Sequence, residues 1–214
     1  MFPERLTKGY RAFIEGRFAV ERGRYQQLAG QGQAPSIMVI GCVDSRVSPE
    51  VIFDAAPGEI LVARNVANLV PRYEPPTTAE DDISHQHGTS AALEFAVRAL
   101  RVRHIVVLGH VFCGGIKAYA SDQTPLTASD FIGRWMSQIA PAAAAITAPR
   151  QDQEGYLRQL EFASVELSLK NLMTFPFIRA AVEEGTLKLH GAYFGVASGK
   201  LLVRDEETGV FQPV

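Results

Sequence analysis

Short runs of apolar, largely β-branched residues recur along this chain, separated by longer segments with apolar residues at helical spacing. The runs at 37–40, 60–63 and 104–109 are typical of buried strands. Between the second and third runs, residues 91–100 place their apolar side chains on one face and follow the small or capping residues 88–90, which favours a helix. The order strand, helix, strand describes a βαβ unit and predicts a parallel sheet covered by helices.

The segments on either side of this unit are predominantly helical in pattern. Residues 4–28 carry apolar side chains near helical spacing among charged ones, which predicts an amphipathic helix and an N-terminal arm over residues 1–30. Further helices are expected at 131–147, where Pro141 should start, kink or interrupt the helix, at 154–173 and at 177–182.

The last apolar segments, 187–196 and 200–205, flank Ser198 and Gly199 and predict a hairpin that adds strands to the sheet. No internal repeat, low-complexity tract or linker divides the 214 residues. We therefore predict one α/β domain over residues 1–214, with a central, mostly parallel sheet flanked by helices, an N-terminal helical arm and a C-terminal hairpin.

Composition and charge narrow the class of protein. Hydrophobic residues make up 47% and charged residues 21%, which excludes a disordered or fibrous chain. A formal net charge of -2 and a pI near 6.2 provide no basic surface, so we expect neither nucleic acid nor a membrane as a partner. The first residues are interrupted by charges, unlike a secretory signal, and no stretch approaches the roughly 20 apolar residues of a membrane span. A cytoplasmic location is the expectation.

The two cysteines are too few for a disulfide framework, and both lie where a predicted strand ends. Cys42 follows the first run, and His110 and Cys113 follow the third. Ligands of open α/β sheets bind beyond the carboxyl ends of the strands, so the three side chains could converge there. Two thiolates and one imidazole are a combination used for catalytic zinc, with the fourth position left for water.

Other interpretations of these residues remain open at this point. Two buried cysteines are often small core hydrophobes, and a turn such as GHVFCGG could cradle a phosphate, although it lacks the spacing of a P-loop or a dinucleotide fingerprint. Asp44 and Arg46, shortly after Cys42, could be a helix cap and a solvated surface residue. Beside a metal, the same two residues could form a charge-assisted pair that controls which group reaches the ion.

The segments CVDSR and HVFC resemble the two-part zinc signature of β-class carbonic anhydrases, C-x-D-S-R and H-x-x-C. The similarity extends to residues 57–70, 87–97, 104–118 and 190–201. It implies that Cys42, His110 and Cys113 bind Zn²⁺ and that Asp44 and Arg46 form a dyad beside the metal. Asp44 is a fourth zinc ligand only in the closed form of the family.

The resemblance also implies an open site and a substrate pocket. The closed subclass has a tryptophan three residues before the first zinc cysteine, where this chain has Val39. Gln33 matches the glutamine that donates its amide hydrogens to an oxygen of carbon dioxide or bicarbonate. The pocket residues would be Leu61, Val66, Phe95 and Gly114. Leu61 and Phe95 stand where plant-type members have phenylalanine and tyrosine, so the pocket wall is expected to differ.

The activity implied is the reversible hydration of carbon dioxide to bicarbonate and a proton, through attack by hydroxide generated at the zinc. An alternative is a zinc hydrolase of the same fold that acts on carbonyl sulfide or carbon disulfide. A non-catalytic zinc protein is disfavoured because structural zinc normally takes four protein ligands. A thiol redox protein would need its two cysteines to pair. The family further implies a homodimer or a tetramer.

The remaining histidines could contribute a proton relay. His85 and His87 lie in a predicted loop and could pass protons to solvent, although the pattern favours exposed loop histidines without a role for each. His104 and His190 lie on predicted strands and are expected to be structural.

Overall fold

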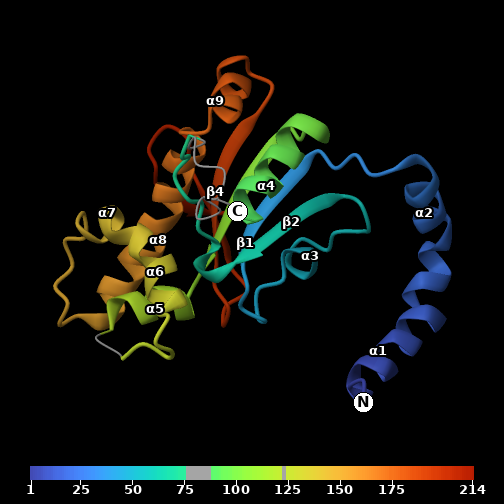
Figure 1. Ribbon diagram of the computed structural model, residues 1–214, viewed down its shortest axis with the longest axis horizontal. Coiled ribbons are helices and arrows are strands. Elements are labelled where there is room, and N and C mark those ends of the chain that lie inside the picture. Colours follow the sequence, from blue (N-terminus) through green and yellow to red (C-terminus); the bar gives the residue numbers. More distant parts are fainter. Residues whose placement is uncertain (76–87, 122–123) are drawn as a thin grey trace.

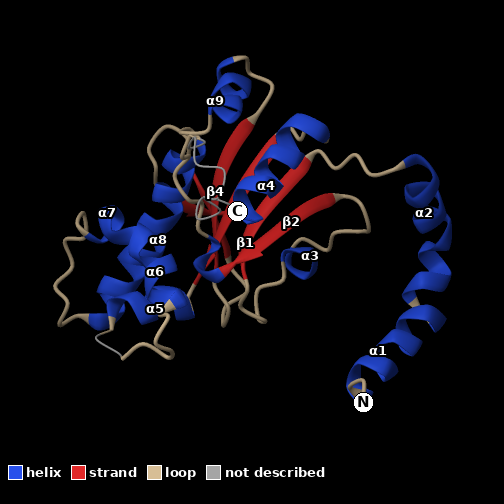
Figure 2. Cartoon of the chain, viewed as in Figure 1, coloured by secondary structure: helices blue, strands red, loops and turns tan. Residues whose placement is uncertain are grey.

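A computed structural model of the protein describes residues 1–75, 88–121 and 124–214 (Figure 1). Six strands of these residues form one sheet in the order β2-β1-β3-β4-β5-β6 (Figure 2). They are β1 (Ile37–Cys42), β2 (Ile60–Asn65), β3 (His104–His110), β4 (Lys188–Phe194), β5 (Leu201–Arg204) and β6 (Phe211–Pro213). The three predicted strands of the βαβ region are thereby confirmed.

The sheet is mixed and mostly parallel, as the sequence predicts. Strand β1 pairs in parallel with both β2 and β3, and β3 pairs in parallel with β4. The C-terminal hairpin consists of β4 and the antiparallel β5. The short strand β6, which the sequence pattern does not predict, adds to β5 at the edge.

Nine α-helices lie in the described residues. They are α1 (Glu4–Glu15), α2 (Arg17–Gln31), α3 (Pro49–Ile52), α4 (Gly88–Glu94), α5 (Gly114–Ala120), α6 (Phe131–Met136), α7 (Ala140–Ala143), α8 (Gln153–Leu172) and α9 (Pro176–Glu183). Those after α2 lie around the sheet (Figure 1). Helix α4 continues into a π-helical turn at Phe95–Ala99.

Two predicted helices are divided in the structure. The amphipathic segment 4–28 forms α1 and α2, separated at Gly16, whose φ of -104° and ψ of -96° lie outside the helical region. The segment 131–147 forms α6, a 3₁₀ turn at Ser137–Ile139 and α7. Pro141 lies in the first turn of α7, where its missing N–H group is tolerated.

The main hydrophobic core lies between one face of the sheet and the helices α4, α8 and α9. Met38 and Ile40 of β1 are fully buried there with Leu93, Val165 and Ile178. The approach of α8 to β3 depends on Gly109, because a Cβ atom at this position would lie 2.7 Å from Cγ2 of Val165. Helix α8 therefore packs directly on the strand that leads to His110.

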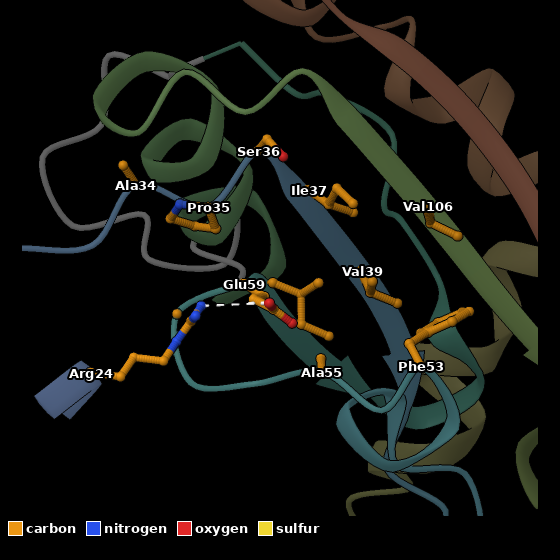
Figure 3. A pocket seen from close by; sticks show the side chains of 12 residues that line it. Arg24, Ala34, Pro35, Ser36, Ile37, Val39, Phe53, Ala55, Glu59 and Val106 are labelled. Atoms are coloured by element: carbon orange, nitrogen blue, oxygen red, sulfur yellow. Dashed lines mark ion pairs between the residues drawn. The ribbon is translucent and has the colours of Figure 1, made fainter. Parts of the chain in front are cut away.

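The other face of the sheet carries a smaller buried cluster, Val39, Leu108 and Ala192. Beside it lies a groove of about 570 Å³, lined by side chains of β1, the neighbouring β3, the loop after α3, and Arg24 of α2 (Figure 3). Arg24 donates to the carbonyl of Pro57 at 2.5 Å and lies 3.7 Å from the carboxylate of Glu59.

The N-terminal arm, α1 and α2, projects away from the sheet (Figure 1). Neither helix of the arm contains a buried residue. Aromatic contacts among Phe13, Phe18 and Tyr25 join the two helices, with ring centroids 5.2–6.1 Å apart. In the described part of the chain, every helix is too short or too polar to span a bilayer.

Candidate metal centre

Cys42, His110 and Cys113 come together at the carboxyl edge of the sheet. Strands β1 and β3 are parallel neighbours, with Ile37 opposite His104, and they end at Cys42 and His110. Sγ of the two cysteines and a ring nitrogen of His110 all lie within 4.8 Å of one another, and each of the three residues is at most 3% exposed. The convergence expected from the strand ends is therefore present.

The imidazole of His110 is oriented as a metal ligand. Its Nδ1 lies 3.0 Å from the carbonyl oxygen of Val111, which places the proton on Nδ1. The buried Nε2 has no hydrogen-bond partner among the described residues. A lone pair on Nε2 between two cysteines fits a zinc ion, whose bonds are about 2.3 Å to sulfur and about 2.0 Å to nitrogen.

The two cysteines have opposite pKa shifts because they lie side by side in a buried position. The Cys113 thiol donates a hydrogen bond to Cys42 and thereby lowers the pKa of Cys42, an effect to which His110 adds. The same hydrogen bond, together with burial, raises the pKa of Cys113. Both cysteines would bind a divalent cation as thiolates, because metal binding favours the deprotonated form of each sulfur.

Phe112 provides the turn that brings His110 and Cys113 to the same point. Its φ of 57° lies in the left-handed region, which costs a non-glycine residue about 1–2 kcal/mol. The N–H group of Val111, just before this turn, donates to the carbonyl oxygen of Phe194 in β4 at 3.0 Å. The strained turn is thus tied to the sheet on its N-terminal side.

Glu161 of α8 holds the other side of the turn. Its side chain is buried, and its Oε1 accepts a hydrogen bond from the backbone N–H of Cys113 at 3.0 Å. Its Oε2 accepts from the hydroxyl of Tyr193 in β4 at 2.5 Å. Burial raises the pKa of Glu161, although both hydrogen bonds oppose this shift. Sequence reasoning missed this residue, but an acidic side chain on the apolar face of the 154–173 pattern is the signal that could have identified it.

Asp44 and Arg46 form the ion pair that the sequence suggests. Arg46 donates from Nε to Oδ1 of Asp44 at 2.9 Å and from Nη2 to Oδ2 at 2.7 Å. The backbone N–H of Arg46 adds a third hydrogen bond to Oδ1 at 3.0 Å. The Arg46 side-chain hydrogen bonds hold the pKa of Asp44 well below its ordinary value, so this carboxylate is ionised at neutral pH. Nη2 of Arg46 also lies 3.3 Å from the carbonyl oxygen of Phe112.

Arg64 fixes the backbone between the first ligand and the dyad. From β2, opposite Gly41, it donates from Nε to the carbonyl of Cys42 at 2.8 Å and from Nη2 to the carbonyl of Asp44 at 2.7 Å. The sequence analysis assigns no such role to Arg64. Its place near the end of the strand beside Cys42 is the signal that was available.

Val66 and Gly114 lie beside the three ligands. Val66 follows β2, whose last residue pairs with Cys42, and its carbonyl accepts a hydrogen bond from the indole N–H of Trp135 at 2.8 Å. Gly114 directly follows Cys113 as the first residue of α5. At Gly115, a Cβ atom would lie 2.8 Å from Cγ1 of Val66. Helix α5 can therefore pack against Val66 only because residue 115 is glycine.

The structure does not bring every predicted site residue to this centre. Gln33 is exposed before the start of β1. Leu61 pairs with Met38 near the amino-terminal end of the edge strand β2, and it packs against the main core. Phe95 is 48% exposed at the start of the π-helical turn. The proposed proton relays, His85 and His87, lie outside the described residues.

His104 and His190, which the sequence analysis treats as structural, form a pair on adjacent strands. Nδ1 of His104 lies 3.0 Å from Nε2 of His190. These residues belong to the amino-terminal half of β3 and β4, away from the carboxyl edge that carries the metal ligands.

Known proteins share this fold and site. A family model described as carbonic anhydrase matches residues 37–201. Beta carbonic anhydrase 3 of Arabidopsis thaliana is 35% identical over 200 residues, which cover 92% of this chain and 74% of that protein.

Two solved structures are similar over almost the whole chain. The β-carbonic anhydrase CcaA has a TM-score of 0.84 and 28% identity, covering 99% of this chain and 91% of that chain. A structure from a study of two tetrameric β-carbonic anhydrases of Sordaria macrospora has a TM-score of 0.75 and 30% identity, covering 97% and 96%.

An α/β sheet with two cysteines and a histidine at its carboxyl edge defines the architecture of a metal-dependent enzyme, and these matches specify which one. The chain belongs to the carbonic anhydrase family, in its β class. The family uses zinc, and the buried cluster of this chain has the donor atoms to bind it.

Proposed function

We propose that Cys42, His110 and Cys113 hold one zinc ion and that the chain uses it for the reversible hydration of carbon dioxide to bicarbonate and a proton. The observation that supports this most is the convergence of three buried donor atoms within 4.8 Å beside an aspartate held by an arginine. When bound, zinc supplies the Lewis acidity that makes water a nucleophile at neutral pH.

Asp44 and Arg46 have complementary tasks in this proposal. The ionised Asp44 accepts a hydrogen bond from the reacting water and so orients it towards carbon dioxide. Arg46 holds both carboxylate oxygens in a bidentate grip, which keeps Asp44 from becoming a ligand itself. The fourth coordination position is then left for the reaction, and the chain is an open-site member of its family.

Gln33 can serve a metal centre only through a second copy of the chain. Strand β1 runs from Ile37 to Cys42, and its five steps of about 3.3 Å separate its ends by roughly 17 Å. Gln33 precedes the far end of that strand. We therefore assign its amide to the site of a neighbouring subunit, where it would bind an oxygen of the substrate, and the exposed Phe95 to the wall of the same pocket.

The assembly that follows from this assignment is a homodimer or a tetramer. The arm carries exposed apolar side chains, including Leu6 and Tyr10, without burying any of its own residues. The groove on the sheet face offers apolar side chains of β1 and β3 to a partner (Figure 3). Exposed apolar surface of this kind is what obligate dimers bury between their subunits. We also propose a cytoplasmic location, since two thiol ligands are best kept reduced there.

The proposed function is tested by zinc content and stopped-flow hydration of carbon dioxide on one preparation. We expect about one zinc per chain and a hydration rate that is lost when the metal is removed and restored when zinc is returned. Hydrolysis of carbonyl sulfide and carbon disulfide is measured in parallel. Faster turnover of either sulfur compound, with negligible hydration, would replace the proposed substrate.

A further inference from the structure

A buried carboxyl group lies behind the metal ligands and takes no part in the reaction as described. Glu161 is 5% exposed, and it joins three parts of the fold: α8, which carries it, β4 through Tyr193, and the turn before α5 through Cys113.

The turn that Glu161 contacts decides where two of the three ligands point. His110 ends β3, and Cys113 follows only after Phe112 has adopted its left-handed conformation. The N–H of Val111 is bound to β4 on one side of Phe112, and the N–H of Cys113 is bound to Glu161 on the other. The carbonyl oxygen of the same peptide group accepts a longer, exposed hydrogen bond from Arg46 at 3.3 Å, so the contact with Glu161 is the buried one that holds Cys113 against relaxation of the strained turn.

We propose that Glu161 is a positioning residue for the metal centre: it fixes the backbone of Cys113, and with it the angle between the sulfur of Cys113 and the imidazole of His110. Tyr193 in turn fixes Glu161. The inference rests on the proposed zinc site and adds to it a support that does not touch the ion. Such outer partners commonly change metal affinity by 10- to 100-fold when they are removed.

Glu161→Gln is the most direct test because it keeps the size of the side chain. In the structure both carboxyl oxygens accept a hydrogen bond, one from Cys113 and one from Tyr193. An amide has one acceptor oxygen, so both hydrogen bonds cannot be kept as they are: if Oε1 accepts from Cys113, the NH2 group faces Tyr193, whose hydroxyl must then accept and loses the acceptor for its own proton. Glu166→Gln is the matched control, since Glu166 lies on the same helix and pairs with Arg204 instead.

The readouts are the visible spectrum of the cobalt(II)-substituted protein and the affinity for zinc measured against a chelator. Thiolate-to-cobalt and ligand-field bands depend on ligand geometry, which a loss of stability elsewhere does not alter. We expect Glu161→Gln to shift these bands and to weaken zinc binding roughly 10-fold or more, whereas Glu166→Gln leaves both as in the wild type.

An unchanged cobalt spectrum and zinc affinity in folded Glu161→Gln would overturn the positioning role, as would equal changes in both glutamine variants. If Glu161→Gln does not fold, Tyr193→Phe decides: it frees Oε2 of Glu161 and should weaken zinc binding in the same direction, and wild-type affinity would overturn the inference. A wild-type protein without thiolate-to-cobalt bands would overturn the zinc site itself, and the positioning role with it.

Discussion

The guanidinium of Arg46 binds both carboxylate oxygens of Asp44, at 2.9 and 2.7 Å, directly beside the three metal ligands. A lysine cannot reproduce this two-point contact, because its ammonium group is a single point charge. The ion pair therefore controls where the Asp44 carboxylate lies relative to the metal.

We predict that Arg46→Ala keeps its zinc and its fold but loses at least about 10-fold in hydration rate, because the released Asp44 can occupy the open coordination position. Arg46→Lys should be impaired in the same direction. Zinc content, thermal stability and initial rates are compared with the wild type. A near wild-type rate with zinc intact would show that Arg46 does not guard that position.

Replacing either thiolate should remove the metal. In Cys42→Ser and Cys113→Ser a neutral hydroxyl stands in place of a charged sulfur ligand, so we expect zinc to fall far below one per chain and hydration activity to fall with it. Metal analysis after gel filtration measures this. Full zinc occupancy in both serine variants would contradict the assignment of the ligands.

Gly114 and Gly115 are adjacent, but only at Gly115 would a Cβ atom meet other atoms at short distance. Alanine substitutions at these two positions therefore distinguish an effect on packing from an effect on activity. A Cβ atom at Gly115 would lie 2.8 Å from Cγ1 of Val66 and 3.1 Å from Sδ of Met136. We expect Gly115→Ala to lower the free energy of unfolding by about 1–3 kcal/mol, as overpacking does. Urea denaturation measures this change.

Gly114→Ala is the control for that experiment, because a Cβ atom there would meet nothing within 4 Å. Its free energy of unfolding should equal that of the wild type within about 0.5 kcal/mol. If Gly114 lines the substrate pocket, the same variant should still lose hydration activity. Equal destabilisation by the two alanines would argue against the close packing of α5 on Val66.

Stability should fall on mild acidification because of His190. Burial lowers its pKa, and the neighbouring His104 and Lys188 act in the same direction, whereas Glu206 opposes them. Since the pKa is about 6.5 in the unfolded chain and lower in the folded chain, the unfolded chain binds more protons between these two values. The free energy of unfolding therefore decreases as pH falls through about 6.5 and stops decreasing, for this group, below the folded pKa.

The contribution of His190 to this pH dependence is measured from the free energy of unfolding of the wild type and of His190→Asn at several pH values between 5 and 8. We expect the asparagine variant to lose part of the slope of unfolding free energy against pH in this range. Parallel curves for the two proteins would mean that His190 does not titrate differently in the folded and unfolded chains.

The strands and the ligand cluster could be predicted from the sequence because both follow from local pattern. Buried parallel strands are continuous apolar runs, and the residues that follow them must meet at one edge of the sheet. Strand β6 was missed because Phe211–Pro213 is too short to show alternation. The break at Gly16 was missed because helical spacing continues across it.

The residues that hold the backbone around the metal ligands were harder to predict from the sequence than the ligands themselves. Arg64, Glu161 and Trp135 bind backbone groups of Cys42, Cys113 and Val66. Their sequence context marks Arg64 and Glu161 as unusual, but it does not show which backbone group each one binds. Gln33 matched a family motif, yet one chain cannot place it at its own metal. Its partner surface depends on assembly, which residue patterns along a single chain do not describe.

The ligands come from β1 and β3, strands that lie side by side in the sheet although β2 and α4 separate them along the chain. During folding, the donor atoms therefore cannot meet until β3 has paired with β1 across that whole intervening segment. His110 and Cys113 are close in the sequence, but the full set of three donors exists only once this pairing is made. We therefore expect tight retention of the ion to report that the centre of the sheet has formed.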